Sequence, residues 1–230
     1  MNIRILQLID GARQATGTTV IIDVFRAFSV ESYLIARGAK NVIPVGEAAL
    51  AYKLKEENPD MILAGERHGK ILPGFDAGNS PSQLLHLDVT GKTAVHTTSA
   101  GTQGIANAVN ATEILGACLL NAKATAEYIK QSGAQDVSLV CMGLEALAPT
   151  EEDTLCAEYI KSLLEGTSID MPSKIAALKY SSGAKFFDKA QQEVFPEADF
   201  HMCTELDKFD FVLKLAKGTD GIDYMEKCCL

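Results

Sequence analysis

Short apolar runs that alternate with helix-forming segments constrain the fold of this chain more than any other feature. Residues 18–22 and 137–142 are apolar and rich in branched side chains, which is typical of strands buried on both faces. Further strands are predicted at 3–9, 42–45, 61–64, 93–97, 114–115, 199–203 and 211–215. One helix is predicted to begin at 27 and to stop at Gly38, and another runs through Val109. Further helices are predicted at 47–56, 80–87, 122–131, 151–164, 173–180 and 184–192. This alternation predicts an α/β fold, with a mostly parallel sheet and helices on both faces, that is, a three-layer α/β/α sandwich.

No linker or repeat divides the chain, so we expect a single domain over residues 1–230, with any subdivision near 165–172. Residues 11–17 are predicted to form a turn, and Cys228 and Cys229 to lie in an irregular tail. The net charge of −9 argues against a nucleic-acid partner. No apolar run approaches the ~18 residues of a membrane span, and no secretory signal is recognisable. We therefore expect a cytoplasmic protein without a membrane partner, and a homo-oligomer is compatible with the sequence.

A polar stretch at residues 65–81 is too rich in charge, glycine and proline for a plain connector. It follows a predicted strand and ends where Ser80 can cap a helix, with Pro81 in the first helical position and Gln83 at capping-box spacing. Loops of more than about 12 residues are uncommon unless they are functional or disordered. The stretch therefore predicts a binding or catalytic loop, the alternative being an ordinary surface loop.

Polar clusters follow four of the predicted strands, at 23–26, 66–67, 97–102 and 151–153. The carboxyl ends of parallel strands meet at one edge of a sheet, where α/β proteins bind their ligands. We therefore expect these clusters and the 65–81 loop to form one site.

Each cluster has a chemical and a structural interpretation. Asp23 can bind a metal ion and Arg26 an anion, or the two can form an ion pair that steadies the turn. The oxygen ligands of Glu66, Asp76 and Asn79 suit Mg²⁺.

The remaining clusters also leave two interpretations open. The loop with Thr97, Thr98, Ser99, Gly101 and Thr102 can hold a phosphate through backbone N–H groups, or simply cap a helix. In the cluster that opens the helix at 151–164, Glu152 falls on the buried stripe, where an acid needs a partner or a metal. Acids there also complement the helix dipole.

Several phosphatase mechanisms are excluded by the order of residues. A cysteine phosphatase needs an arginine shortly after its cysteine, but every arginine here precedes every cysteine. Asp-x-Asp is absent, which excludes an aspartyl-phosphate phosphatase of the haloacid dehalogenase type. Gly-x-Gly-x-x-Gly is also absent, so the sequence gives no support to a dinucleotide enzyme. Arg67-His68-Gly69 matches histidine phosphatases over three residues only, and no later histidine has a matching context.

Taken in order, the clusters resemble the 2-phosphosulfolactate phosphatase (ComB-like) family from about residue 18 to 164. The resemblance rests on Asp-Val-Phe-Arg-Ala at 23–27, Gly-Glu-Arg at 65–67, Gly-Phe-Asp-Ala-Gly-Asn-Ser-Pro at 74–81, Thr-Thr with Gly-Thr at 97–102, and Glu-Asp at 152–153. His68 and the longer Ser99-Ala100 loop depart from the family pattern.

The resemblance implies Mg²⁺-dependent hydrolysis of a small anionic phosphorylated substrate, 2-phospho-3-sulfolactate, on a route to coenzyme M. It implies that Asp23, Glu66, Glu152 and Asp153 are metal ligands or the catalytic base, and that Arg26, Arg67 and residues 98–102 hold the anion. Asp76, Asn79, Ser80 and Thr97 are further substrate-binding candidates. Attack by water and attack by a carboxylate both remain open. Alternatives are a phosphatase for another small phosphorylated acid and a non-catalytic anion-binding relative.

Overall fold

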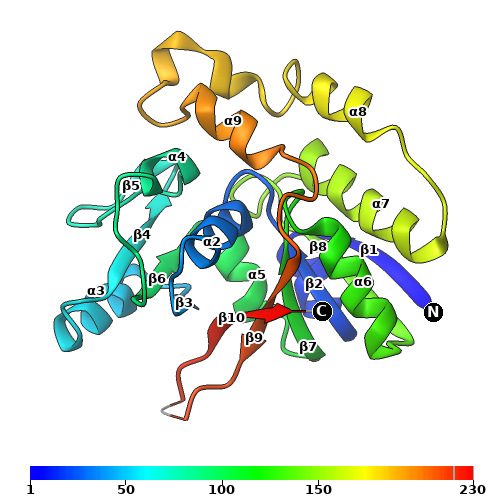
Figure 1. Ribbon diagram of the computed structural model, residues 1–230, viewed down its shortest axis with the longest axis horizontal. Helices are drawn as coiled ribbons and strands as arrows, with labels where there is room; N and C mark the ends of the chain where they lie inside the picture. Colours follow the sequence, from blue (N-terminus) through cyan, green and yellow to red (C-terminus); the bar gives the residue numbers. More distant parts are fainter. Residues whose placement is uncertain (220, 230) are drawn as a thin grey trace.

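The computed structural model describes residues 1–219 and 221–229, whose ten strands form one sheet (Figure 1). The strands are β1 (Asn2–Gln7), β2 (Gly17–Ile22), β3 (Asn41–Pro44), β4 (Ile62–Arg67), β5 (Lys70–Ile71), β6 (Thr93–Thr97), β7 (Ala111–Ala117), β8 (Asp136–Cys141), β9 (Phe211–Ala216) and β10 (Tyr224–Cys229). Their order across the sheet is β1-β8-β2-β7-β9-β10-β3-β6-β4-β5.

The sheet is parallel over most of its width, as predicted. The neighbouring strands β1, β8, β2 and β7 pair in parallel, and so do β3, β6 and β4. The antiparallel hairpin β9–β10 lies between these two groups and joins them, because β9 pairs with β7 and β10 pairs with β3. The apolar residues of β2 and β8 are buried, as expected for strands covered on both faces.

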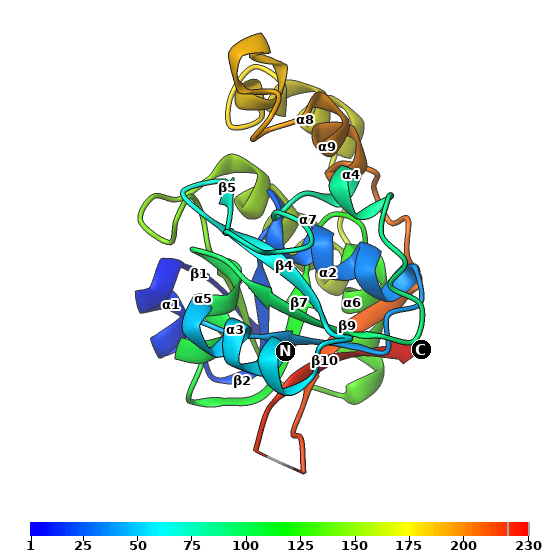
Figure 2. The same ribbon diagram turned by 90° about the vertical axis from the view of Figure 1, so that its left-hand side faces the viewer.

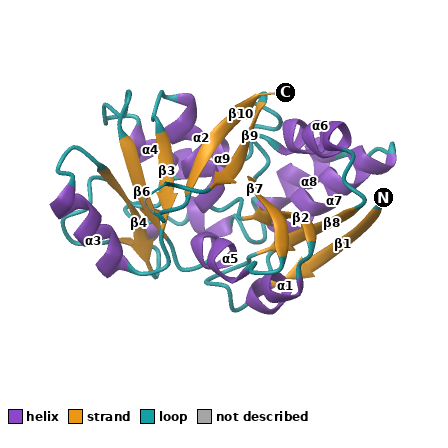
Figure 3. Ribbon diagram, turned by 90° about the horizontal axis from the view of Figure 1, so that it is seen from below, coloured by secondary structure: helices purple, strands orange, loops and turns teal. Residues whose placement is uncertain are grey.

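Helices cover both faces of the sheet, which confirms the three-layer arrangement (Figure 3). The helix α1 packs against α5 beside β1 and β2, while α6 and α7 pack together beside β7 and β8. The helices are α1 (Leu8–Gln14), α2 (Ala27–Ala36), α3 (Ala48–Glu57), α4 (Pro81–Leu84), α5 (Gly101–Asn107), α6 (Ala122–Ser132), α7 (Glu151–Glu165), α8 (Met171–Leu178) and α9 (Glu197–Cys203). None of the described helices combines the length and the apolarity that crossing a membrane requires.

The segment from α8 to α9 projects beyond one end of the sheet in both Figures 1 and 2. It contains two short 3₁₀ helices, η1 (Ala184–Phe187) and η2 (Lys189–Gln191), and its helix α9 packs on α4. Aromatic rings hold the segment together, since Phe186 is fully buried and contacts Phe25, Phe195 and Phe200.

Several local predictions are wrong. Part of the predicted turn at 11–17 belongs to α1, the predicted strand at 199–203 lies in α9, and Cys228 and Cys229 lie in β10 rather than in a tail. The capping box at Ser80 does not form, because the Gln83 side chain accepts a hydrogen bond from Gly78 N instead. The predicted helix at 184–192 is replaced by η1 and η2.

Candidate active site

Four loops that follow parallel strands meet in one small pocket, as the sequence predicted. The pocket has a volume of about 100 Å³. Its wall is formed by residues at the carboxyl ends of β2, β4, β6 and β8. The first turn of α7 and part of the α8–α9 segment complete the wall. The pocket therefore lies at the carboxyl edge of the sheet, where the ends of parallel strands converge.

Asp23 directly follows β2 and is buried at the pocket wall, with 4% of its surface exposed. Its Oδ1 accepts a hydrogen bond from Ala27 N at 3.0 Å. Burial raises the pKa of Asp23 to about 6, and the negative charges of Glu152 and Glu66 add to this effect. Gly101 is required beside it, because a Cβ there would lie 2.6 Å from the Ala27 Cβ and 3.0 Å from Asp23 Oδ2.

Glu66 also lines the pocket, but both of its carboxylate oxygens are used by the backbone. Oε2 accepts a hydrogen bond from Gly69 N at 2.6 Å, and Oε1 accepts one from Ser99 N at 2.8 Å. The Glu66 carboxylate thus holds the loop after β4 to the loop after β6. The strand approaches β6 closely at Gly65, where a Cβ would lie 2.2 Å from Thr97 O.

Arg67 does not line the pocket. Its guanidinium donates to Glu66 O at 2.7 Å, to Gly46 O at 2.9 Å and to Thr97 Oγ1 at 2.9 Å. These hydrogen bonds hold the side chains of Arg67 and Thr97 together at the end of the sheet. Neither of these two predicted residues lines the pocket.

Glu152 and Asp153 lie in the first turn of α7 and are both buried. Asp153 accepts hydrogen bonds from Val24 N and Gly143 N, each at 2.8 Å, and so joins the loops after β2 and β8. Burial and the charges of Glu152 and Asp23 raise the pKa of Asp153 well above its usual range. Glu152 lines the pocket, and its Oε2 is buried without a hydrogen-bond partner in the described part of the chain.

The loop after β6 contributes Thr98, Ser99 and Ala100 to the pocket. Thr98 N donates to Thr102 Oγ1 at 3.1 Å, and Thr102 N donates to Thr98 Oγ1 at 3.3 Å, so both hydroxyls hold the turn. Ser99 Oγ, by contrast, is buried with no hydrogen-bond partner among residues 1–219 and 221–229. Ser99 therefore has a hydroxyl that is free to bind a ligand.

The 65–81 loop divides between the pocket and its surroundings. Asn79 lines the pocket, and its Oδ1 lies 3.2 Å from Nε2 of the buried His96, whose Nδ1 lies 2.9 Å from Glu31 Oε1. Ser80 lines a neighbouring cavity of about 320 Å³ that shares Asn79 with the pocket. Asp76 lies elsewhere and accepts a hydrogen bond from Leu63 N at 2.8 Å.

The α8–α9 segment supplies residues that sequence reasoning missed. Asp199 forms a fully buried ion pair with Arg26, at 2.7 Å from Nη1, so Arg26 does not pair with Asp23. Lys185 and Phe195 line the pocket. No motif marks these residues. The only available signal was an acid at position 199 among apolar neighbours, which predicts a buried partner.

His68 borders the pocket, but its side chain is 82% exposed and contacts Glu145 at 3.0 Å. This exposed position gives no support to the short match with histidine phosphatases.

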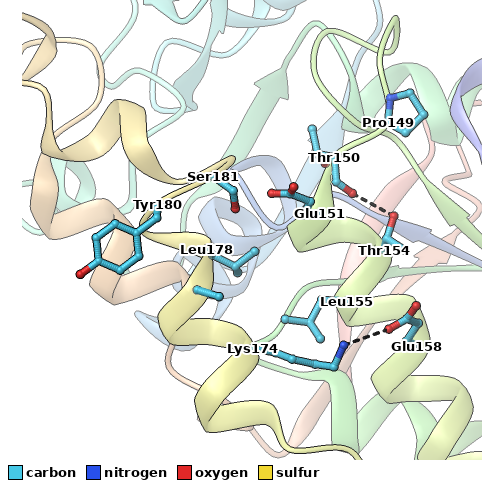
Figure 4. Close-up of a pocket in the computed structure, with 11 residues that line it drawn as sticks. Pro149, Thr150, Glu151, Thr154, Leu155, Glu158, Lys174, Leu178, Tyr180 and Ser181 are labelled. Carbon is cyan, nitrogen blue, oxygen red and sulfur yellow. Dashed lines mark hydrogen bonds and ion pairs between the residues drawn. The ribbon is translucent and has the colours of Figure 1, made fainter.

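A larger groove of about 620 Å³ lies between α7 and α8, away from these residues (Figure 4). Leu155 and Leu178 line it, and an ion pair between Lys174 and Glu158, 3.9 Å long, crosses one end. No loop after a parallel strand except that ending at Thr150 reaches it in the described structure. The small pocket is therefore the better candidate for an active site.

Comparison with known proteins identifies relatives over nearly the whole chain. The sequence model of the 2-phosphosulpholactate phosphatase family matches residues 3–218. A Bacillus subtilis protein named probable 2-phosphosulfolactate phosphatase is 35% identical over 198 residues, which cover 85% of this chain and 86% of that protein. Proteins with the same name are 35% identical in Caldanaerobacter subterraneus, over 86% of this chain and 88% of the relative, and 27% identical in Thermoplasma volcanium, over 93% and 97%.

Proposed function

Because this chain belongs to the 2-phosphosulfolactate phosphatase family, we propose that it hydrolyses 2-phospho-3-sulfolactate to 3-sulfolactate and inorganic phosphate. Family membership places it among the phosphoric monoester hydrolases. A second candidate is hydrolysis of another small phosphorylated acid, which the departures at His68 and Ser99 from the family pattern favour.

The observation that carries the proposal is a small pocket whose acids keep unused oxygens. Glu152 Oε2 has no hydrogen-bond partner in the described structure, and the hydrogen bond of Asp23 uses Oδ1 only. A buried ionised acid with an unused oxygen costs stability unless a proton, a cation or a ligand meets it, and such acids cluster at functional sites. The volume of about 100 Å³, next to a cavity of about 320 Å³, suits a small ester rather than a nucleotide or a peptide.

The chain contributes chiefly by holding the pocket in one shape. Phosphate-monoester hydrolysis needs accelerations of up to ~10²¹-fold, mostly from positioning and charge stabilisation. Glu66 and Asp153 each bind two backbone N–H groups from different loops, so they fix the positions of the loops that carry the other groups. Ser99 Oγ is available to donate a hydrogen bond to a phosphoryl oxygen.

The acid cluster fits a magnesium ion held by Asp23 and Glu152. Mg²⁺ commonly binds through one or two carboxylates, water and the phosphate of its substrate. No group of three His, Cys, Asp or Glu side chains is arranged to hold a metal over residues 1–219 and 221–229. Glu66 and Asp153, also predicted as ligands, use both oxygens for backbone hydrogen bonds. When bound, the ion would neutralise charge on the phosphoryl oxygens.

The proposal is tested by measuring phosphate release from 2-phospho-3-sulfolactate and from a panel of small phosphorylated acids, with Mg²⁺ and with a chelator. Turnover of the sulfolactate ester that stops with the chelator is the expected result. Turnover of a different ester alone would support phosphatase activity but identify another substrate. A folded protein that releases phosphate from none of them would refute the phosphatase proposal.

The Asp23→Ala variant separates an enzyme from a pure anion binder. An enzyme loses turnover when the carboxylate is removed. A binder would hold the phosphorylated acid as well or better, because a negative charge beside the anion is gone.

A further inference from the structure

The positive charges around the pocket differ in how far they are already used. Arg67 donates three hydrogen bonds to protein oxygens. Arg26 lines the pocket, but its Nη1 is bound to Asp199 at 2.7 Å and to Val194 O at 2.9 Å, and the ion pair is buried. Arg67 is thus committed to protein oxygens, whereas at Arg26 only Nη1 forms hydrogen bonds within the described residues.

Lys185 is a second cation at this pocket. It belongs to η1 and lines the same pocket as Asp23 and Glu152. Its Nζ lies 5.9 Å from the ring centroid of Phe25, 5.6 Å from that of Phe186 and 5.1 Å from that of Phe195. No carboxylate lies within 4.0 Å of it in the described residues. Its ammonium group is therefore still able to bind an anion.

The surroundings of Lys185 act on its charge in opposite directions, and burial is the largest effect. Burial lowers the pKa of Lys185, while the nearby Glu152, Asp23 and Asp153 act in the opposite direction. The three aromatic rings shield the ammonium from water, and charge interactions are stronger where water is excluded. A phosphate entering between acids meets repulsion, so a cation on the opposing chain segment has a direct use.

The position of Lys185 is fixed by contacts between the α8–α9 segment and the sheet body (Figure 2). Asp199 Oδ2 binds Arg26 of the loop before α2, and Asp199 Oδ1 accepts a hydrogen bond from Ser82 N of α4 at 2.9 Å. Val194 O binds the same arginine. A segment that is distant in sequence is thereby anchored beside the pocket.

We propose that Lys185 is a catalytic residue that binds the phosphoryl group of the substrate, so that the α8–α9 segment completes the active site. This inference rests on the proposed phosphatase function. Lysine binds phosphate as a point charge, and its ammonium stabilises the charge on the phosphoryl oxygens during transfer. No bond to lysine forms or breaks in this role.

The test compares Lys185→Met, Lys185→Arg and a control, Lys179→Met, in the full chain. Lys179 lies in the same segment and also covers a ring, with Nζ 4.3 Å from the centroid of Phe187, but it does not line the pocket. We expect Lys185→Met to lower kcat/KM about 10²-fold. Lys185→Arg should recover part of this loss, and Lys179→Met should match the wild type. Equal urea-unfolding midpoints would show that the methionine variants are folded.

Binding of inorganic phosphate, measured by calorimetry, separates this proposal from the function on which it rests. If the wild type turns over an ester and Lys185→Met keeps both turnover and phosphate affinity, the role of Lys185 is refuted while the phosphatase stands. If the wild type turns over no ester, a loss of phosphate affinity of about tenfold or more in Lys185→Met still supports an anion-binding lysine. Absence of both turnover and phosphate binding in the wild type would refute both proposals.

Discussion

Replacing Asp23 with asparagine should stabilise the metal-free protein at neutral pH. Burial raises the pKa of this carboxyl from 3.8 to about 6 in the folded protein, so ionisation is less favourable there than in the unfolded chain. A difference of about two pH units corresponds to roughly 3 kcal/mol of unfolding free energy, since each unit is worth about 1.4 kcal/mol. Asparagine is neutral in both states and keeps an oxygen that can accept the hydrogen bond from Ala27 N.

The pH dependence fixes the sign of this effect. Below pH 3.8 the carboxyl is protonated in both states and costs nothing. As the pH rises through about 6, the wild type loses the stability that the protonated carboxyl provides, whereas Asp23→Asn does not. The difference in unfolding free energy between variant and wild type should therefore grow by roughly 3 kcal/mol between about pH 4 and pH 7.5.

The assay is urea unfolding of both proteins across this pH range, in the presence of a chelator. Groups distant from Asp23 titrate equally in both proteins and cancel in the difference, whereas Asp153, whose pKa the Asp23 charge helps to raise, adds a contribution of the same sign. Asp88→Asn is a suitable control, because hydrogen bonds from Thr90 lower the pKa of Asp88, and its difference should change with pH in the opposite direction. If the difference in unfolding free energy between Asp23→Asn and the wild type stays constant from pH 4 to pH 7.5, the carboxyl of Asp23 does not have a raised pKa and the reasoning is refuted.

Two further predictions concern the support of the pocket. Arg26→Met leaves Asp199 buried without its partner, so the unfolding free energy in urea should fall by about 3–5 kcal/mol, and a loss below about 1 kcal/mol would contradict the role of this pair. Gly101→Ala places a Cβ 2.6 Å from the Ala27 Cβ and 3.0 Å from Asp23 Oδ2, so displacement of the carboxylate should lower kcat/KM about 10²-fold. Unchanged kinetics of this variant would show that the Asp23 position is not critical.

The sequence predicted the architecture well where periodicity is strong. The buried strands β2 and β8 are rich in apolar and branched side chains and were placed within about a residue of their observed limits. The errors fall on short elements. Residues 199–203 alternate polar and apolar side chains, as a strand does, and the seven-residue α9 is too short to show helical periodicity. The hairpin β9–β10 inserts between parallel strands through pairing that no local pattern encodes.

Glu66 and Arg67, predicted together, are separated in the structure for a geometric reason. The sequence placed both in a loop, but β4 extends to Arg67, and neighbouring residues of a strand point to opposite faces. Glu66 therefore faces the pocket while Arg67 binds Gly46 O and Thr97. The contribution of Lys185 could not be predicted, because it depends on how a distant segment folds back over the sheet.

The four buried acids differ in how many hydrogen bonds their carboxylates accept, and this difference separates acids that hold the loops from acids that can bind a cation or substrate. Glu66 and Asp153 bind two backbone N–H groups each, so their burial is offset by hydrogen bonds. Asp23 and Glu152 are buried with fewer partners, which lowers stability unless a cation or substrate binds there. Asp23→Asn consequently separates the two remaining interpretations. Gain of stability with loss of turnover identifies an enzyme whose strained acid is functional, whereas gain of stability with tighter phosphate binding and no wild-type turnover identifies an anion binder.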